Sequence, residues 1–284
     1  MAMRNELTAL KLLMHAATRP CALVCRAFAA ICLFAWAAAI GHAADRQPAA
    51  LGDSPVTSDY EREKRWADEI LPTVVVGEPV YLQQANGHRF LGLYTVAQKA
   101  RAAVLSVHGR GWNPDWGLNG VMRVALADAG YTTLSIQMPV LDAGGKLEAY
   151  LHLFDEANER LALATAYLEA HGYSTVAIVS HSLGARMSNE FLTGHPPSSI
   201  KAWVSIGIIN GLQNTQWVKV PMLDIFGEKD WNGVLNGAPE RERLIRAIPG
   251  SLQVVVPGAD HFFEGRENAL VAHVRAFLDK QLTP

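Results

Sequence analysis

The stretch Ser180-His181-Ser182-Leu183-Gly184 joins an apolar run to the start of an amphipathic segment. A serine hydroxyl on such a sharp join can attack a carbonyl carbon once a neighbouring base takes its proton. The stretch differs from the nucleophile pattern G-x-S-x-G only at its first position, where serine stands in place of glycine. Because serine is nearly as small as glycine, this departure is tolerable, and the pattern predicts Ser182 as the nucleophile.

An acid and a base follow the nucleophile along the chain. Asp230 and His261 each come shortly after a later apolar run. In such a triad the histidine accepts the serine proton, and the aspartate fixes its tautomer and stabilises the imidazolium. Asp224 is a rival acid, but it lies within an apolar run and is expected to face a helix layer. We therefore predict Ser182, Asp230 and His261 as catalytic residues.

An oxyanion hole and a substrate pocket are expected beside the triad. The backbone N–H groups of Leu183 and Arg110 are the candidate donors, and Trp112 and Trp231 are the candidate substrate-binding residues. Two roles are open for the Arg110 guanidinium. In the first, it folds outward onto Asp115 or Trp112 and stiffens the loop. In the second, it lines the cleft and recognises a carboxylate or phosphate on the substrate.

The other histidines are interpreted as structural. His181 is expected to point away from the cleft. His171 precedes a glycine at a helix end, where a cation interacts favourably with the helix dipole. His195 precedes two prolines in a loop, and His273 falls within the last helical pattern.

The elements that position these residues alternate between apolar runs typical of strands and the apolar periodicity of helices. Apolar runs typical of strands cover 102–107, 132–138, 175–180, 201–208, 221–226 and 252–256. Helical patterns cover 118–129, 155–171, 183–193, 239–247 and 266–281. Alternation of this kind predicts an α/β fold, with a mostly parallel central sheet and helices on both faces. Ligands bind at the carboxyl ends of the strands in such sheets, which is where the predicted triad falls.

Two further signals precede this alternating region. Ser58-x-x-Glu61 is a capping box that predicts the start of a helix. Asn86-Gly87, between strand patterns at 78–83 and 89–97, predicts a hairpin with a type I′ turn. The chain has no long insertion that predicts a large lid.

The first 43 residues have the organisation of a secretory signal peptide. Basic residues are followed by an apolar run over 27–40, and small residues precede a cleavage site after Ala43. That run of 14 residues is shorter than the roughly 20 needed to span a bilayer. We expect residues 44–57 to be a linker, 58–284 to be a single domain, and the protein to be periplasmic or secreted, with no membrane span after cleavage.

Composition excludes several other classes. All three cysteines lie within residues 1–43, so the mature chain has neither a disulfide framework nor a thiolate nucleophile. It carries 21 basic and 26 acidic residues, a formal charge of −5, which argues against nucleic acid and anionic membranes as partners. Metal-ligand and phosphate-loop motifs are missing from the sequence, so no metal or cofactor is expected. The oligomeric state is left open.

From about Val80 to its end the chain resembles the α/β-hydrolase superfamily. The resemblance rests on the order Ser182, Asp230, His261 and on the His-Gly loop at 108–111. The segments 74–79, 108–116 and 134–139 are similar to a family of exported bacterial α/β-hydrolase-like proteins of uncharacterised function. Many members of that family have glycine at the nucleophile position, where this chain has Ser182.

Two functions follow from these patterns. The first is a serine hydrolase that cleaves a small-molecule carboxylic ester or thioester through an acyl-enzyme. The alternative is a non-catalytic protein of the same fold that binds a component of the cell envelope. Because a fold does not by itself give a function, the geometry of the site has to separate them.

Overall fold

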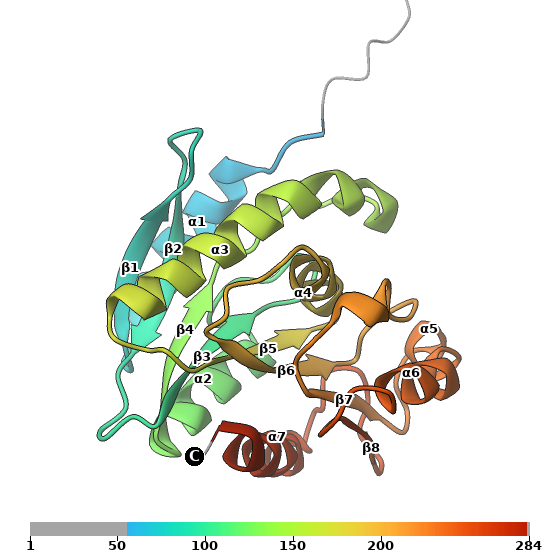
Figure 1. Ribbon diagram of the computed structural model, residues 1–284. Helices are drawn as coiled ribbons and strands as arrows, with labels where there is room; N and C mark the ends of the chain where they lie inside the picture. The colour runs from blue at the N-terminus through green and yellow to red at the C-terminus, as the bar shows by residue number, and fades with distance from the viewer. Residues whose placement is uncertain (1–55, 283–284) are drawn as a thin grey trace, which may run out of the picture. The chain divides into compact units, whose positions relative to one another are not determined.

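The computed structural model describes residues 56–282, which fall within one compact unit (Figure 1). The predicted signal peptide and most of the predicted linker lie outside these residues. None of the described helices is long and apolar enough to cross a bilayer.

A single eight-stranded sheet forms the centre of this unit. Its strands are β1 Glu78–Gln83, β2 Arg89–Thr95, β3 Ala102–Val107, β4 Tyr131–Ile136, β5 Val176–His181, β6 Ile200–Ile206, β7 Met222–Gly227 and β8 Leu252–Val256. They lie in the order β1-β2-β4-β3-β5-β6-β7-β8. The hairpin strands β1 and β2 are antiparallel to their neighbours, and β3 to β8 are parallel. The predicted mostly parallel sheet is confirmed.

Helices cover both faces of the sheet. The α-helices are α1 Tyr60–Ile70, α2 Leu118–Asp128, α3 Phe154–Ala170, α4 Leu183–Thr193, α5 Asn232–Leu235, α6 Ala238–Ile245 and α7 Glu267–Leu282. Three 3₁₀ helices are η1 Leu71–Thr73, η2 Leu147–Leu153 and η3 Thr215–Trp217. Helices α3 and α4 lie on one face and α2 and α7 on the other (Figure 1).

The two largest hydrophobic cores lie one on each side of the sheet. Strands β3 to β7 are almost entirely buried, which explains why they read as continuous apolar runs rather than as alternating ones. The α2–α7 core contains Met122, Val274 and Phe277, and the α3–α4 core contains Leu161, Met187 and Trp203. Both cores hold the carboxyl ends of the parallel strands rigidly in place.

Two local predictions are wrong in detail. The N-cap of α1 is Asp59, whose carboxylate accepts from the Arg62 N–H at 2.8 Å. Ser58 instead donates its hydroxyl hydrogen to Glu156 of α3 at 2.6 Å. A tertiary partner therefore removed the hydroxyl that the capping box required, and the adjacent carboxylate took its place.

The hairpin forms, but not with a type I′ turn. Its connection covers residues 84–88 and is closed by a hydrogen bond from Gln84 N to His88 O at 2.8 Å. Gly87 has a positive φ of 88°, whereas Asn86 does not. The Asn86 side chain accepts from the His88 N–H and donates to the Tyr60 hydroxyl, and these bonds favour the longer loop.

Candidate active site

The sharp turn between β5 and α4 carries Ser182. This serine has φ 54° and ψ −119°, a conformation that is strained for a residue with a side chain. Gly184 is required two residues later, because a Cβ there would overlap the carbonyl oxygen of His108. The strand end and the loop after β3 thus meet closely around the predicted nucleophile.

Ser180 fits where the nucleophile pattern has glycine because its hydroxyl is satisfied within the core. Its Oγ accepts from the indole N–H of Trp203 at 2.8 Å and donates to the Val204 carbonyl at 3.2 Å. A buried hydroxyl with both a donor and an acceptor carries little desolvation cost. The departure from the pattern is therefore accommodated by strand β6.

The structure brings the three predicted catalytic residues into one hydrogen-bonded chain. His261 Nε2 lies 3.0 Å from Ser182 Oγ, and His261 Nδ1 lies 2.6 Å from Asp230 Oδ1. All three residues are buried, with at most 5% of each exposed. The serine is within reach of a base, and that base is oriented by an acid.

Asp230 is fixed by its own backbone surroundings. Its Oδ1 also accepts from the Trp231 N–H at 2.7 Å, and its Oδ2 faces the Gly227 N–H at 3.4 Å. Gly207 at the end of β6, with φ 57°, lets the chain pass beside this carboxylate, since a Cβ there would lie 3.2 Å from Asp230 Oδ2. The acid therefore has little freedom to rotate away from the histidine.

The rival acid Asp224 lies elsewhere, as expected. It is fully buried in β7, and its Oδ2 accepts from Arg241 Nε and Gln253 Nε2, both at 2.8 Å. Burial raises the pKa of Asp224, and the neighbouring Arg241 opposes that rise. Asp224 is a structural ion-pair residue between β7 and α6.

The residues of the predicted oxyanion-hole donors, Arg110 and Leu183, line the same pocket as Ser182. Neither the Arg110 N–H nor the Leu183 N–H has a hydrogen-bond acceptor among residues 56–282. Leu183 is the first residue of α4, where backbone N–H groups are unpaired and the helix dipole favours negative charge. Both groups are thus available to an oxyanion at the serine.

His108 and Gln137 hold the loop that carries Arg110. His108 donates from Nδ1 to the Gly109 carbonyl at 2.8 Å and accepts at Nε2 from the Met138 N–H at 2.8 Å. Burial lowers the pKa of His108 to about 4, so the ring is neutral at pH 7. Gln137 Nε2 lies 3.0 Å from the same His108 nitrogen and bonds to the Trp112 carbonyl at 3.3 Å.

The expectation for His181 is wrong, because its side chain lines the cleft. Its ring stacks on Trp112, with the centroids 4.9 Å apart, and its Nε2 donates to the His261 carbonyl at 3.0 Å. Burial, together with the nearby His261, lowers the pKa of His181 to about 3. A neutral His181 thus connects the end of β5 to the loop that carries the predicted base.

A pocket of about 420 Å³ opens over Ser182. The predicted residues Arg110, Trp112 and Trp231 line it. Sequence reasoning did not identify four other lining residues: Leu147, Ile209, Gly233 and Phe262. Phe262 could have been found because it adjoins His261, whereas Leu147 of η2, Gly233 of α5 and Ile209 of the loop after β6 have no signal of their own.

Arg110 and Trp231 differ in what surrounds their side chains. The Asp115 carboxylate is bound by Arg123, at 2.6 Å from Nε, so it does not receive the Arg110 guanidinium. Arg110 is exposed and has no ion pair among the described residues. Trp231 stacks flat on His261, with 3.7 Å between centroids and 17° between planes.

The remaining histidines take the structural places expected of them. His171 is the C-cap residue of α3 and bonds to the Tyr167 carbonyl at 2.7 Å. His195 lies in the loop after α4, and His273 is exposed on α7. No cluster of three or more potential metal ligands occurs within residues 56–282.

No protein-family model matches this sequence, and comparison with curated protein sequences gives no match either. Comparison with solved structures, in contrast, gives many. Dienelactone hydrolase from Anabaena variabilis has a TM-score of 0.59 and 21% identity, over 72% of this chain and 97% of that one. Esterase Pf2001 from Pyrococcus furiosus has a TM-score of 0.60 and 14% identity, over 72% of this chain and 90% of that one.

A third neighbour, Est1E from Butyrivibrio proteoclasticus, has a TM-score of 0.58 and 13% identity, covering 72% of this chain and 98% of that one. At these identities the likeness concerns architecture. This chain has the α/β-hydrolase fold.

Proposed function

We propose that this protein is a serine hydrolase that cleaves a carboxylic ester or thioester through an acyl-enzyme. The observation that carries this proposal is the hydrogen-bonded chain from Ser182 through His261 to Asp230. Ser182 lies on a strained turn, and the Arg110 and Leu183 N–H groups in the same pocket have no acceptor within residues 56–282. The fold shared with esterases and a dienelactone hydrolase supports the same reaction class.

The proposed reaction has two halves. His261 takes the Ser182 proton as the hydroxyl oxygen attacks the carbonyl carbon, and the resulting oxyanion accepts hydrogen bonds from the Arg110 and Leu183 N–H groups. When this intermediate collapses, the imidazolium gives its proton to the leaving alcohol or thiol, and an acyl-serine remains. Water, deprotonated by His261, then attacks the acyl-serine, releases the carboxylic acid and restores the serine.

The pocket indicates the size and nature of the substrate. A volume of about 420 Å³ suits a small molecule, and Trp112, Trp231 and Ile209 provide apolar surface around the scissile bond. We propose that the enzyme acts in the periplasm or outside the cell, as the leader sequence at residues 1–43 suggests.

The first prediction concerns Ser182. Ser182→Ala should abolish labelling by a fluorophosphonate probe and lower kcat by about 10⁶-fold, because no other group can form the acyl-enzyme. Ser188→Ala is the matched control, since this buried serine of the same helix has no hydrogen-bond partner in the described structure. Probe labelling and turnover of an ester panel provide the measurements.

The two candidate functions give opposite results in this experiment. A hydrolase labels at Ser182 and loses labelling only in Ser182→Ala. A non-catalytic binding protein labels at neither serine and turns over no ester. Equal turnover by wild type and Ser182→Ala would contradict the proposed mechanism.

A further inference from the structure

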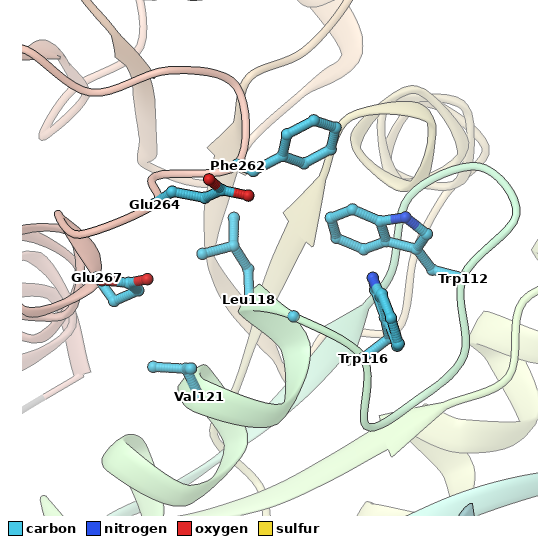
Figure 2. A pocket seen from close by; sticks show the side chains of 8 residues that line it. Trp112, Trp116, Leu118, Val121, Phe262, Glu264 and Glu267 are labelled. Carbon is cyan, nitrogen blue, oxygen red and sulfur yellow. The ribbon is translucent and has the colours of Figure 1, made fainter. Parts of the chain in front are cut away.

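A second hollow adjoins the Ser182 pocket and has no role in the proposed reaction. It has a volume of about 460 Å³ and shares Trp112 and Phe262 with the first pocket. Figure 2 shows Trp112 and Trp116 on one side of the hollow and Glu264 and Glu267 on the other. The rings of Trp112 and Phe262, with centroids 5.6 Å apart, line both hollows.

The aromatic side chains of this hollow are accessible to a ligand. Trp116 is 59% exposed and Phe262 is 37% exposed, although both are large apolar residues that folding normally buries. Leu118 and Val121 of α2 add aliphatic surface. The hollow therefore offers ring surfaces to a guest rather than to the protein interior.

The charge of the hollow is negative. Neither Glu264 nor Glu267 forms an ion pair within residues 56–282, and no cationic side chain lines the hollow. Two nearby arginines are directed elsewhere: Arg123 is buried against Asp115, and Arg266 bonds to the Gly265 carbonyl at 3.3 Å. Arg110 lines the first pocket and not this hollow.

We infer that this second hollow binds an alkylated ammonium group carried by the alcohol portion of the substrate. Indole and phenyl faces attract such cations through the ring quadrupole, and nearby carboxylates add Coulombic attraction. Glu267 Oε1 accepts a hydrogen bond from the Gly265 N–H at 3.1 Å, but neither glutamate has a cationic partner within residues 56–282. A neutral apolar group would gain from the rings alone and would leave both negative charges without a counter-ion. Charge complementarity thus favours the cation.

The place of the hollow indicates which end of the substrate it holds. The leaving oxygen must lie near His261, because it receives its proton from that ring. Phe262, the next residue, begins the wall of the second hollow. The alcohol side of the ester therefore points toward Glu264. The assignment of the ammonium group to the alcohol portion rests on the proposed esterase reaction. Binding of the ammonium group to the hollow can be tested without turnover.

The binding experiment compares choline with 3,3-dimethylbutan-1-ol, which has the same shape and no charge. Titration of Ser182→Ala protein, followed by NMR of the methyl protons, should show choline binding about fivefold or more tightly than the neutral analogue. The double variant Glu264→Gln, Glu267→Gln should reduce that preference to about twofold or less. Glu61→Gln, an exposed glutamate on α1, is the control and should leave it unchanged.

Trp116→Leu tests the aromatic contribution separately, since leucine keeps apolar surface but has no ring. It should weaken choline binding and leave binding of the neutral analogue within about twofold. Equal binding of the two ligands to the parent protein would overturn the inference, as would a choline preference that survives the double glutamate substitution.

A kinetic comparison separates this inference from the proposed function. Esters of ω-trimethylammonio alcohols should have lower KM than the matching tert-butyl esters with the wild-type enzyme, and the double variant should remove the difference. Absence of all turnover, with the choline preference intact, would refute the hydrolase and retain the site. Turnover with no preference between the two ester series would refute the site as a substrate subsite and retain the hydrolase.

Discussion

The imidazole of His261 is surrounded by aromatic rings. The Trp231 ring covers one face, with 3.7 Å between ring centroids. The centroid of the His181 ring lies 4.8 Å away, and the Phe262 ring packs edge-on with its centroid at 5.2 Å. This enclosure shields the ring from water, and the indole face would favour the imidazolium of the proposed reaction. Because the pKa of His181 is lowered to about 3, that neighbour adds no positive charge to oppose it.

The two buried aspartates should respond differently to loss of charge. Asp230→Asn keeps the shape of the acid but favours the wrong histidine tautomer, so kcat should fall by roughly 10⁴-fold. Asp224→Asn leaves Arg241 buried with a weaker partner, so the free energy of unfolding should fall by about 3 kcal/mol with activity retained. Steady-state kinetics and urea denaturation distinguish them, and the reverse pattern would assign the catalytic acid to Asp224.

Arg110 lines the pocket without an ion pair in the described structure, which favours an anion-binding role for its guanidinium. Arg110→Ala should then raise KM for esters with a carboxylate near the scissile bond about tenfold or more, and change KM for neutral esters little. Added salt should weaken the wild-type preference in the same direction. Equal losses for both ester types, accompanied by a lower melting temperature, would instead show that Arg110 only braces its loop.

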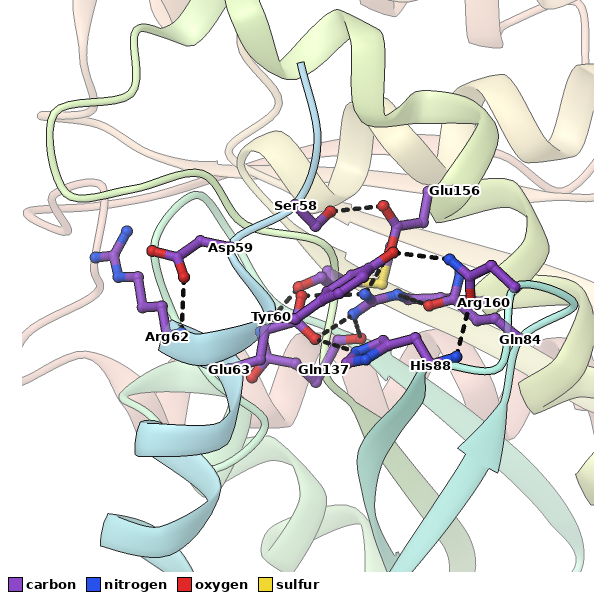
Figure 3. Close-up of polar contacts among 12 residues, drawn as sticks. Ser58, Asp59, Tyr60, Arg62, Glu63, Gln84, His88, Gln137, Glu156 and Arg160 are labelled. Atoms are coloured by element: carbon purple, nitrogen blue, oxygen red, sulfur yellow. Dashed lines mark hydrogen bonds and ion pairs between the residues drawn. The ribbon is translucent and has the colours of Figure 1, made fainter. Parts of the chain in front are cut away.

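At the level of elements, α1 is attached to the domain by a buried ion-pair network (Figure 3). Arg160 of α3 is fully buried and binds both carboxylate oxygens of Glu63, each at 3.0 Å. His88 Nε2 lies 3.0 Å from Glu63 Oε2, and the His88 ring stacks on Tyr60 with 3.6 Å between ring centroids. The same arginine donates to the Gln137 carbonyl, which connects the network to the loop that holds Arg110.

Breaking this network should be costly. Glu63→Gln leaves Arg160 with only part of its compensating charge, so the free energy of unfolding should fall by about 3 kcal/mol. Lys64→Gln, which removes the exposed Lys64–Asp68 pair of the same helix, should change it by less than about 1 kcal/mol. Urea denaturation of both variants gives the comparison, and similar small losses would mean that α1 contributes little to stability.

On the scale of the whole domain, two neutral histidines buried between the sheet and its loops couple stability to pH. Burial lowers the pKa of His108 to about 4 and that of His181 to about 3. Below pH 6.5 the unfolded chain therefore binds protons that the folded protein does not. Stability should be greatest above that pH and fall as the pH decreases toward 4.

The expected loss is up to about 1.4 kcal/mol per pH unit for each histidine. Urea denaturation at pH 7.5 and pH 5 should show it, and the loss should be smaller in His181→Gln, which cannot titrate. The exposed His273→Gln is the control and should keep the wild-type dependence. A wild-type stability independent of pH over this range would contradict the buried neutral state of both rings.

Much of the sheet could be predicted because its signals are local. The apolar runs at 102–107 and 252–256 match β3 and β8 to the residue. The run of β3 is continuous because that strand is buried on both faces, whereas β8 is an edge strand on which Leu252 and Val255 are exposed. The helical pattern at 183–193 matches α4 in the same way. The proposed triad followed from position, because residues directly after parallel strands meet on one edge of the sheet.

Features that depend on contacts between distant segments could not be read from the sequence. Ser58 lost its capping role to a bond with Glu156, 98 residues away. The direction of His181 depended on the loop of His261, 80 residues further along the chain. Helix and strand periods therefore determined the elements and their order, because they reflect which face of each element meets water. Only the packing of distant helices and loops against one another decided the second hollow, the α1 network and the orientation of side chains in the cleft, because those contacts exist only once the sheet has formed.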